Sequence, residues 1–188
     1  MEANYTYIRN CTFTGCTEGL MAYWTRLVKV VNCTFTGNSI GLYLKHTHDL
    51  KILDCRFNGN SQFGAIVDRS EFTVLEDSEF TGSEWDGLSF WTSIFVEVVN
   101  CTSWGNGYGY TFRNTPISTV LNSDSYSNVN SGILLRDVNS WNVMPPYALL
   151  GSGTVSPTRT DLPRGDYLPS NVIGGWNGKR TLITHSRI

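Results

Sequence analysis

The chain is 188 residues long, which fits one domain of ordinary size, and it carries 14 Lys and Arg against 16 Asp and Glu. The resulting net charge of −2 gives no reason to expect nucleic acid as a partner. No run of residues approaches the ~18 apolar positions that a membrane-spanning helix needs. Ser, Thr, Asn, Gly and aromatic residues are frequent instead, and this composition is typical of short strands and tight turns.

The first recognisable element of the chain begins an internal repeat. The octapeptide IRNCTFTG at 8–15 returns 22 residues later as VVNCTFTG at 30–37. An Asn or Asp followed by Cys or Ser then recurs every 22 or 23 residues through six repeats, and a glycine before an apolar alternation recurs with the same period. The pairs are Asn10-Cys11, Asn32-Cys33, Asp54-Cys55, Asp77-Ser78, Asn100-Cys101 and Asn122-Ser123; the glycines are Gly19, Gly41, Gly64, Gly87, Gly109 and Gly132.

Each repeat contains three short segments with the two-residue alternation of β-strands. The first segment follows the glycine, as in LYLK at 42–45; the second is exemplified by LKIL at 50–53 and the third by CTFT at 33–36. No helical stretch of ~10 residues separates them, which excludes leucine-rich, ankyrin and other helical solenoids. The pattern therefore predicts a parallel β-helix, in which each repeat is one coil and like strands of neighbouring coils pair about 4.8 Å apart.

Stacking of the coils predicts that equivalent residues lie above one another. The Phe positions and the Cys/Ser positions are expected to fill the interior. The Asn/Asp column is expected at the bend between the second and third strands, because these residues tolerate a left-handed backbone and stacked amides can hydrogen-bond. Of the five cysteines, Cys11, Cys33, Cys55 and Cys101 belong to the interior column and Cys16 to a turn, so we expect free thiols.

These features resemble the right-handed parallel β-helix superfamily, which includes pectate lyases, polygalacturonases, alginate epimerases and phage tailspikes. The resemblance covers about residues 5 to 143 and is closest in character to phage tailspikes and surface β-helix repeat proteins. It implies an all-β fold, a right-handed single-stranded parallel β-helix of about six coils. The repeat ends at MPP, 144–146, so we expect β-helix coils over 1–143 and a non-repetitive cap or extension over 144–188, which could serve in oligomerisation.

The resemblance also implies that a sugar-binding groove follows the outer face of the first strand and its flanking turns. Aromatic rings stack on sugar faces, and charged groups hold hydroxyls or carboxylates. The alternative is that Lys45 and Asp68 form a surface ion pair and that the aromatic residues only cover strands. The expected carbohydrate-binding residues are Tyr23, Tyr43, Lys45, Trp85, Trp91, Arg113 and Arg136.

Catalytic residues are less clearly indicated. Glycoside hydrolysis needs two carboxyl groups about 5 to 9 Å apart, and Asp68 with Glu84 or Asp86 is expected to meet this requirement on one face of adjacent coils. The motifs of polygalacturonases and epimerases, and the acidic trio for calcium of pectate lyases, are missing. We expect no metal and no cofactor.

These features favour a polysaccharide-binding module that forms the C-terminal part of a larger virion protein (a tailspike or fibre) or cell-surface protein. Polysaccharide is the expected partner, with a homotrimer as a further expectation, and the location would be the virion, the extracellular space or the cell surface. Two alternatives stay open. One is a polysaccharide lyase or glycoside hydrolase that acts on an acidic or O-antigen-type glycan, and the other is a structural spacer.

Overall fold

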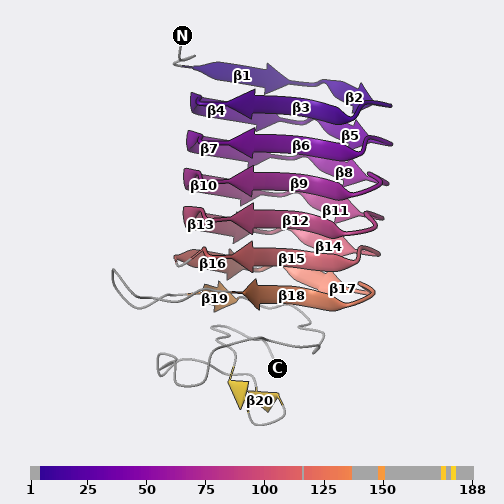
Figure 1. Cartoon of the computed structure of the whole chain (residues 1–188), viewed down its shortest axis with the longest axis vertical. Helices are drawn as coiled ribbons and strands as arrows, with labels where there is room; N and C mark the ends of the chain where they lie inside the picture. The colour runs from indigo at the N-terminus through magenta and orange to yellow at the C-terminus, as the bar shows by residue number, and fades with distance from the viewer. Residues whose placement is uncertain (1–4, 116, 137–147, 151–174, 177–178, 181–188) are drawn as a thin grey trace.

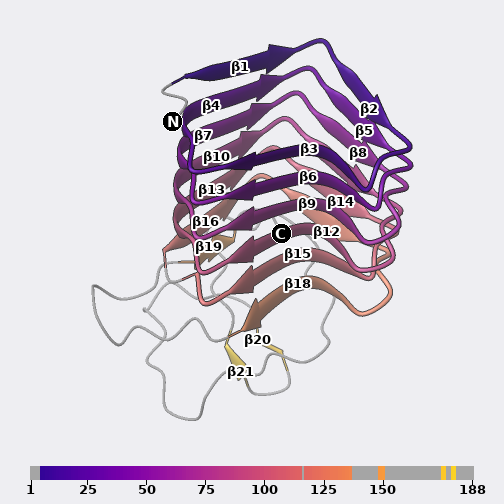
Figure 2. The same ribbon diagram turned by 45° about the horizontal axis from the view of Figure 1, so that its top comes forward.

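The protein is a parallel β-helix, and the predicted all-β fold is confirmed. The computed structural model describes residues 5–115, 117–136, 148–150, 175–176 and 179–180. Three parallel sheets run the length of the stack, and each strand pairs with the equivalent strand one coil away (Figure 1). Figure 2 shows the three sheets as separate faces that meet at bends around the interior. Within the described residues no helix is long and apolar enough to cross a bilayer.

Each strand of the first sheet contains the repeated glycine as its second residue. These strands pair in a register that matches one repeat to the next, for example Leu42 with Ala65. The strands are β3 (Glu18–Tyr23), β6 (Ile40–Lys45), β9 (Phe63–Asp68), β12 (Asp86–Trp91), β15 (Tyr108–Arg113) and β18 (Ser131–Arg136).

The second and third sheets complete each coil. The second sheet contains β1 (Thr6–Arg9), β4 (Arg26–Val31), β7 (His48–Leu53), β10 (Glu71–Glu76), β13 (Ile94–Val99), β16 (Ser118–Leu121) and β19 (Ala148–Leu150). The third sheet contains β2 (Thr12–Thr14), β5 (Thr34–Thr36), β8 (Arg56–Asn58), β11 (Glu79–Thr81), β14 (Thr102–Trp104) and β17 (Asp124–Tyr126).

The predicted phenylalanine column forms the centre of the interior. Phe13, Phe35, Phe57 and Phe80 stack with nearly parallel rings and centroid separations of 4.8, 4.7 and 4.7 Å. Phe35, Phe57 and Phe80 are completely buried. Because each such side chain contributes roughly 1.5–3 kcal/mol by leaving water, this column is a main source of the coil-to-coil stability.

The Asn/Asp column lies at the bend between the second and third sheets, as predicted. All six of its residues have a left-handed backbone, with φ between 48° and 55°. Asn32 Nδ2 donates to Asn10 Oδ1 at 2.9 Å. The carboxylates of Asp54 and Asp77 have no hydrogen to donate, and this explains why amide bonding does not continue through the middle of the column.

A second asparagine column, which sequence reasoning missed, is buried at the bend between the third and first sheets. Asn38 donates from Nδ2 to Asn60 Oδ1 at 3.1 Å, and its backbone N–H donates to the same oxygen at 3.1 Å. Asn60 Nδ2 in turn donates to the Phe35 carbonyl at 3.1 Å. Asn106 and Asn128 repeat the arrangement further along the stack. These amides satisfy backbone groups that a buried bend would otherwise leave unpaired.

The repeated glycine, which is the second residue of each first-sheet strand, is required by close backbone approach. A Cβ at Gly64 would lie against the carbonyl oxygen of Gly87 in the next coil, closer than real Cβ contacts allow. Any larger residue at this position would therefore push two coils apart, which explains the glycine periodicity of the sequence.

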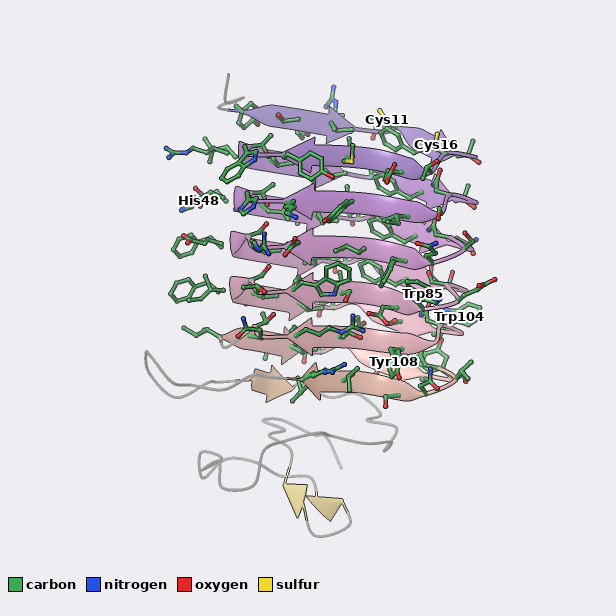
Figure 3. The ribbon with its side chains drawn as sticks, in the orientation of Figure 1. Cys11, Cys16, His48, Trp85, Trp104 and Tyr108 are labelled. Atoms are coloured by element: carbon green, nitrogen blue, oxygen red, sulfur yellow. The ribbon has the colours of Figure 1, made fainter. Side chains whose placement is uncertain are left out.

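The five cysteines are free, as expected, but only three of them are buried. Cys33, Cys55 and Cys101 occupy the interior column, and burial raises the pKa of the Cys55 and Cys101 thiols to about 12. Cys16 and Cys11 are exposed (Figure 3). The expectation that Cys11 is buried is wrong, because Cys11 belongs to the first described coil and has a neighbouring coil on one side only.

The strand β19 lies within the segment that we expected to form a cap. It pairs in parallel with β16, with Ser118 opposite Ala148, and so extends the second sheet by one strand. Beyond it, β20 (Gly175–Trp176) and β21 (Lys179–Arg180) form an antiparallel pair. The rest of 144–188 lies outside the described residues, and the division at 143 and the role of the extension stay predictions.

Candidate functional site

The outer face of the first sheet carries one residue per coil in a single column. Strand pairing sets Lys45 beside Asp68, Asp68 beside Trp91 and Trp91 beside Arg113. Tyr23 precedes Lys45 in this column, and Arg136 follows Arg113. Because paired strands lie about 4.8 Å apart, the structure brings these predicted site residues together at the C-terminal ends of the first-sheet strands.

Lys45 and Asp68 form an ion pair at the middle of the column. Lys45 Nζ lies 3.2 Å from Asp68 Oδ2, and Arg69 Nε lies 3.9 Å from the other carboxylate oxygen. Tyr43 lies beside this pair and meets the Tyr23 ring edge-on, with the centroids 5.7 Å apart. Desolvation by burial raises the pKa of Tyr43; the positive charge of Lys45 opposes this shift. The Asp68 carboxylate is therefore neutralised by its own neighbours.

Three aromatic residues form a cluster at the next coils. The Phe63 ring is buried and meets two indoles edge-on, Trp85 at a centroid distance of 5.1 Å and Trp91 at 5.7 Å. Trp85 precedes β12 and remains 52% exposed (Figure 3). A rigidly packed aromatic ring that still has half of its surface in water can offer an apolar face to a ligand.

Asp86 is the buried carboxylate of this face. Asp86 is the first residue of β12 and is only 1% exposed. Desolvation by burial raises its pKa, while the positive charge of Arg113 and the hydroxyl groups of Ser89 and Thr111 oppose the shift. Arg113 Nη2 lies 3.3 Å from Asp86 Oδ2. A carboxylate this deeply buried is stable only because the guanidinium and the hydroxyls compensate part of its lost hydration.

Trp91 links the aromatic cluster to the Asp86–Arg113 pair. Its Nε1 donates to Ser89 Oγ at 2.7 Å, and the Arg113 guanidinium lies over its ring, 5.8 Å from the centroid. Arg113 Nε is buried without a hydrogen bond within the described part of the chain. Unsatisfied buried donors are uncommon in native proteins and are often explained by a missing ligand or water.

The strand register separates Asp68 from Asp86, two of the residues expected to supply catalytic carboxyl groups. Asp86 lies level with the start of β9, whereas Asp68 is the last residue of that strand. The two backbone positions are thus separated by about five residues along the strands, or roughly 16 Å. Glu84 is exposed in the turn before β12. The strand register, rather than membership of the same face, sets this distance.

The family assignment comes from a match to the amino-terminal part of the chain. Residues 1–103, more than half of the chain, match the family model described as the right-handed β-helix region. The chain belongs to the right-handed β-helix family. This assignment supplies the hand of the coils and confirms the resemblance that the repeat indicated. No curated protein matches the chain in sequence.

Solved structures with the same fold include two enzymes. The A-module of mannuronan C-5 epimerase AlgE4 from Azotobacter vinelandii is 18% identical, with a TM-score of 0.67 over 70% of this chain and 39% of the epimerase. The periplasmic alginate epimerase AlgG is 15% identical, with a TM-score of 0.68 over 87% of this chain and 45% of the enzyme. This right-handed β-helix therefore spans less than half of either neighbour, and at these identities the likeness shows the fold alone.

Sequence reasoning missed several members of the site in this right-handed β-helix. The sequence analysis assigned no site role to Phe63, Ser89 or Thr111. The signal for Ser89 and Thr111 was present, because both alternate with interior residues and both flank the Trp91–Arg113 positions. In the part of the chain that the structure describes, no group of three or more His, Cys, Asp or Glu residues is placed to hold a metal ion.

Proposed function

We propose that the outer face of the first sheet binds a polysaccharide. The observation that carries this proposal is the exposed Trp85 ring beside the ion pair of the buried Asp86 with the partly exposed Arg113. The indole offers an apolar surface on which a sugar ring can stack, and the polar groups beside it can bind hydroxyls. The Arg113 side chain is 34% exposed, so its guanidinium can contact a bound sugar as well as Asp86.

The periodic arrangement of the face favours a chain-like ligand over a single small molecule. Tyr23, Tyr43 and Trp91 lie on successive or nearby coils, so aromatic contacts recur along the stack. Lys45, Arg113 and Arg136 add positive charge to the same column, which suits a glycan with carboxylate groups. Two proteins with this fold are named as epimerases of mannuronan and of alginate, which is consistent with a carbohydrate ligand.

Binding assays with matched aromatic variants test the proposal. A glycan array followed by calorimetry would compare the unmodified protein with Trp85→Ala and Tyr43→Ala. We expect at least a tenfold loss of affinity in each variant. Phe72→Ala is the control, because Phe72 is an exposed aromatic residue of the second sheet, away from this face. Binding that survives both site variants, or that Phe72→Ala weakens equally, would overturn the proposal.

A second candidate function is enzymatic action on a uronic acid polymer, and the environment of Asp86 favours it. Perturbed carboxyl groups in clefts are frequent in active sites, and Arg113 could neutralise a sugar carboxylate while Asp86 exchanges a proton. The separation of Asp68 from Asp86 argues against a two-carboxyl hydrolase that uses this pair. Product analysis by NMR after incubation with uronate polymers, with Asp86→Asn and Asp68→Asn as variants, separates the two functions. If the polymers are unchanged after incubation, the enzymatic function is ruled out for them and binding remains as the proposed function.

We also propose that the module works outside the cytoplasm, as part of a larger virion or cell-surface protein, and that it forms a homotrimer. One protein of the same fold is described as periplasmic, and glycan ligands of this kind occur at cell surfaces. Light scattering on the purified chain counts its subunits. A monomer at all concentrations would remove the trimer from this proposal without affecting the binding face.

A further inference from the structure

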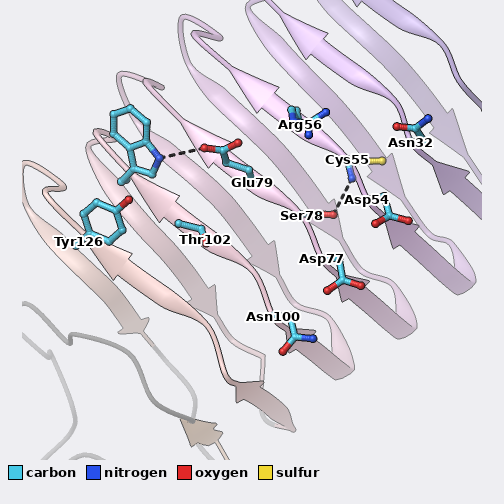
Figure 4. Close-up of a pocket in the computed structure, with 11 residues that line it drawn as sticks. Asn32, Asp54, Cys55, Arg56, Asp77, Ser78, Glu79, Asn100, Thr102 and Tyr126 are labelled. Carbon is cyan, nitrogen blue, oxygen red and sulfur yellow. Dashed lines mark hydrogen bonds between the residues drawn. The ribbon is translucent and has the colours of Figure 1, made fainter.

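The outer face of the third sheet contains a groove that the sequence did not indicate. It has a volume of about 610 Å³ and follows the third sheet and its bend with the second sheet over successive coils (Figure 4). None of the residues of the first-sheet site lines it. The lining residues used below are Asp54, Arg56, Asp77, Glu79, Trp104 and Tyr126.

Two aromatic side chains form one end of this groove. Trp104 and Tyr126 are register partners on β14 and β17, and their rings are parallel within 5° with centroids 6.4 Å apart. Trp104 is 40% exposed and Tyr126 is 43% exposed. The Trp104 indole donates from Nε1 to Glu79 Oε1 at 3.2 Å, which fixes the orientation of the ring. Two exposed rings that are held in one orientation can contact consecutive sugar rings with little loss of side-chain entropy.

Polar side chains without partners continue the groove beside the aromatic pair. Asp54 and Asp77 are exposed at the left-handed bends of neighbouring coils, and Arg56 is exposed at the start of β8. None of these three side chains forms an ion pair or hydrogen bond with another residue of the described chain. Their charged groups are therefore free to bind a ligand, and carboxylates can accept hydrogen bonds from pairs of sugar hydroxyls.

The charge of the groove selects between classes of glycan. Three carboxylates (Asp54, Asp77 and Glu79) face one guanidinium (Arg56), so the lining has a net charge of −2. This balance repels a polymer of uronic acids and favours neutral sugars or protonated amino sugars. The first-sheet site has the opposite character, because its three cationic residues (Lys45, Arg113 and Arg136) outnumber the two carboxylates of Asp68 and Asp86.

We propose that this groove is a second carbohydrate-binding site, which takes a chain of neutral or amino sugars. Trp104 and Tyr126 stack on the sugar rings, and Asp54 and Asp77 bind hydroxyl or ammonium groups. Glu79 is a positioning residue, because it acts through the Trp104 indole. The site does not depend on the function proposed for the first sheet, since the two faces use different residues and opposite charge.

Calorimetric titration with three hexasaccharides tests the proposal: a glucosamine hexamer, a neutral glucose hexamer and an alginate hexamer. We expect the glucosamine or glucose hexamer to bind, with affinity at least tenfold weaker in Trp104→Ala and in Tyr126→Ala. Phe95→Ala, which removes an aromatic residue of the second sheet that is 43% exposed, should leave this affinity unchanged. Asp77→Asn should weaken glucosamine binding more than glucose binding, because it removes a negative charge.

Two results would overturn the proposal. One is the absence of binding by both the glucosamine and the glucose hexamer at millimolar concentration. The other is binding that both Trp104→Ala and Tyr126→Ala leave unchanged in variants whose urea unfolding midpoints match that of the parent. Loss of alginate binding in Trp85→Ala concerns the first sheet only, so the failure of one site is distinguishable from the failure of the other.

Discussion

Asn38 and Asn60 are 22 residues apart in the sequence, yet Asn38 Nδ2 donates to Asn60 Oδ1 at 3.1 Å in the interior of the bend between the third and first sheets. Asn60 also accepts from the Asn38 backbone N–H and donates to the Phe35 carbonyl. One amide thus satisfies buried polar groups of two neighbouring coils, and it adds to the backbone bond from the Ser61 N–H to the Asn38 carbonyl at the same bend.

Asn60→Ala should therefore destabilise the protein strongly. The substitution removes the acceptor of the Asn38 backbone N–H, one of the two acceptors of Asn38 Nδ2 and a donor to the Phe35 carbonyl. Each buried unsatisfied group costs about 1–3 kcal/mol. We expect a loss of more than about 2 kcal/mol in urea unfolding. Asn130→Ala, at an exposed asparagine, is the control and should change stability by less than about 0.5 kcal/mol. Equal effects of the two substitutions would contradict the role assigned to the buried column.

The phenylalanine column should be equally sensitive to truncation. Phe57 stacks on Phe35 and on Phe80 and is completely buried. Phe57→Ala removes both ring contacts and leaves a cavity, so we expect a loss of about 3–5 kcal/mol of unfolding free energy. Phe57→Leu fills part of the space and should cost clearly less. If both substitutions have the same small effect in chemical denaturation, the interior is not packed as described.

Thiol reactivity should divide the cysteines into two groups. At pH 8 a maleimide or Ellman-type reagent should modify Cys11 and Cys16 in the folded protein, because both are exposed. Cys55 and Cys101 are buried with pKa values raised to about 12, and burial also raises the pKa of Cys33, so these three thiols lack both access and thiolate character. Mass spectrometry of labelled peptides, before and after unfolding in urea, gives the assignment. Rapid labelling of Cys55 in the folded protein would be incompatible with this interior.

Asp86 should make stability depend on pH in a direction unusual for a carboxyl group. Burial raises its pKa above the ordinary value of 3.8, so the folded state holds the proton more tightly than the unfolded state does. The contribution of protonated Asp86 to the unfolding free energy is fully present at pH values below 3.8, and it is lost as the pH rises through the raised pKa. The unfolding free energy of the parent, relative to Asp86→Asn, should therefore fall as the pH increases across this range. A difference that stays constant, or that grows with pH, would show that the carboxylate is not desolvated.

The repeat made most of the fold predictable, because every coil has its interior residues, bends and glycine at equivalent positions. The positions of Leu42, Leu44, Phe35 and the left-handed Asn/Asp residues followed from two-residue alternation and from known turn preferences. The buried Asn38–Asn60 column was missed although it also recurs with the repeat. Asparagine is frequent in exposed turns, and nothing in the local sequence shows that a turn faces inward.

The site was less predictable than the fold because it depends on register and on side-chain packing. The column from Lys45 to Arg113 followed from the period of the repeat. The separation of Asp68 from Asp86 did not, because the sequence placed both on one face without fixing their positions along the strands. The burial of Asp86 is set by Trp91, Arg113 and their neighbours on adjacent coils. The third-sheet groove likewise arises from Trp104 and Tyr126, which single repeats present as unrelated aromatic residues.

The residue-by-residue pairing of each coil with the next has a consequence for how such a chain can change its length. A gene duplication that adds one complete turn of 22 or 23 residues gives the new turn the same neighbours above and below as every other turn has. Inserting a single residue within a strand would instead exchange the inward and outward positions of the side chains that follow. It would also break the glycine and asparagine contacts between coils. Related sequences should therefore differ in length by whole coils. Each added coil would lengthen both the first-sheet site and the third-sheet groove by one strand.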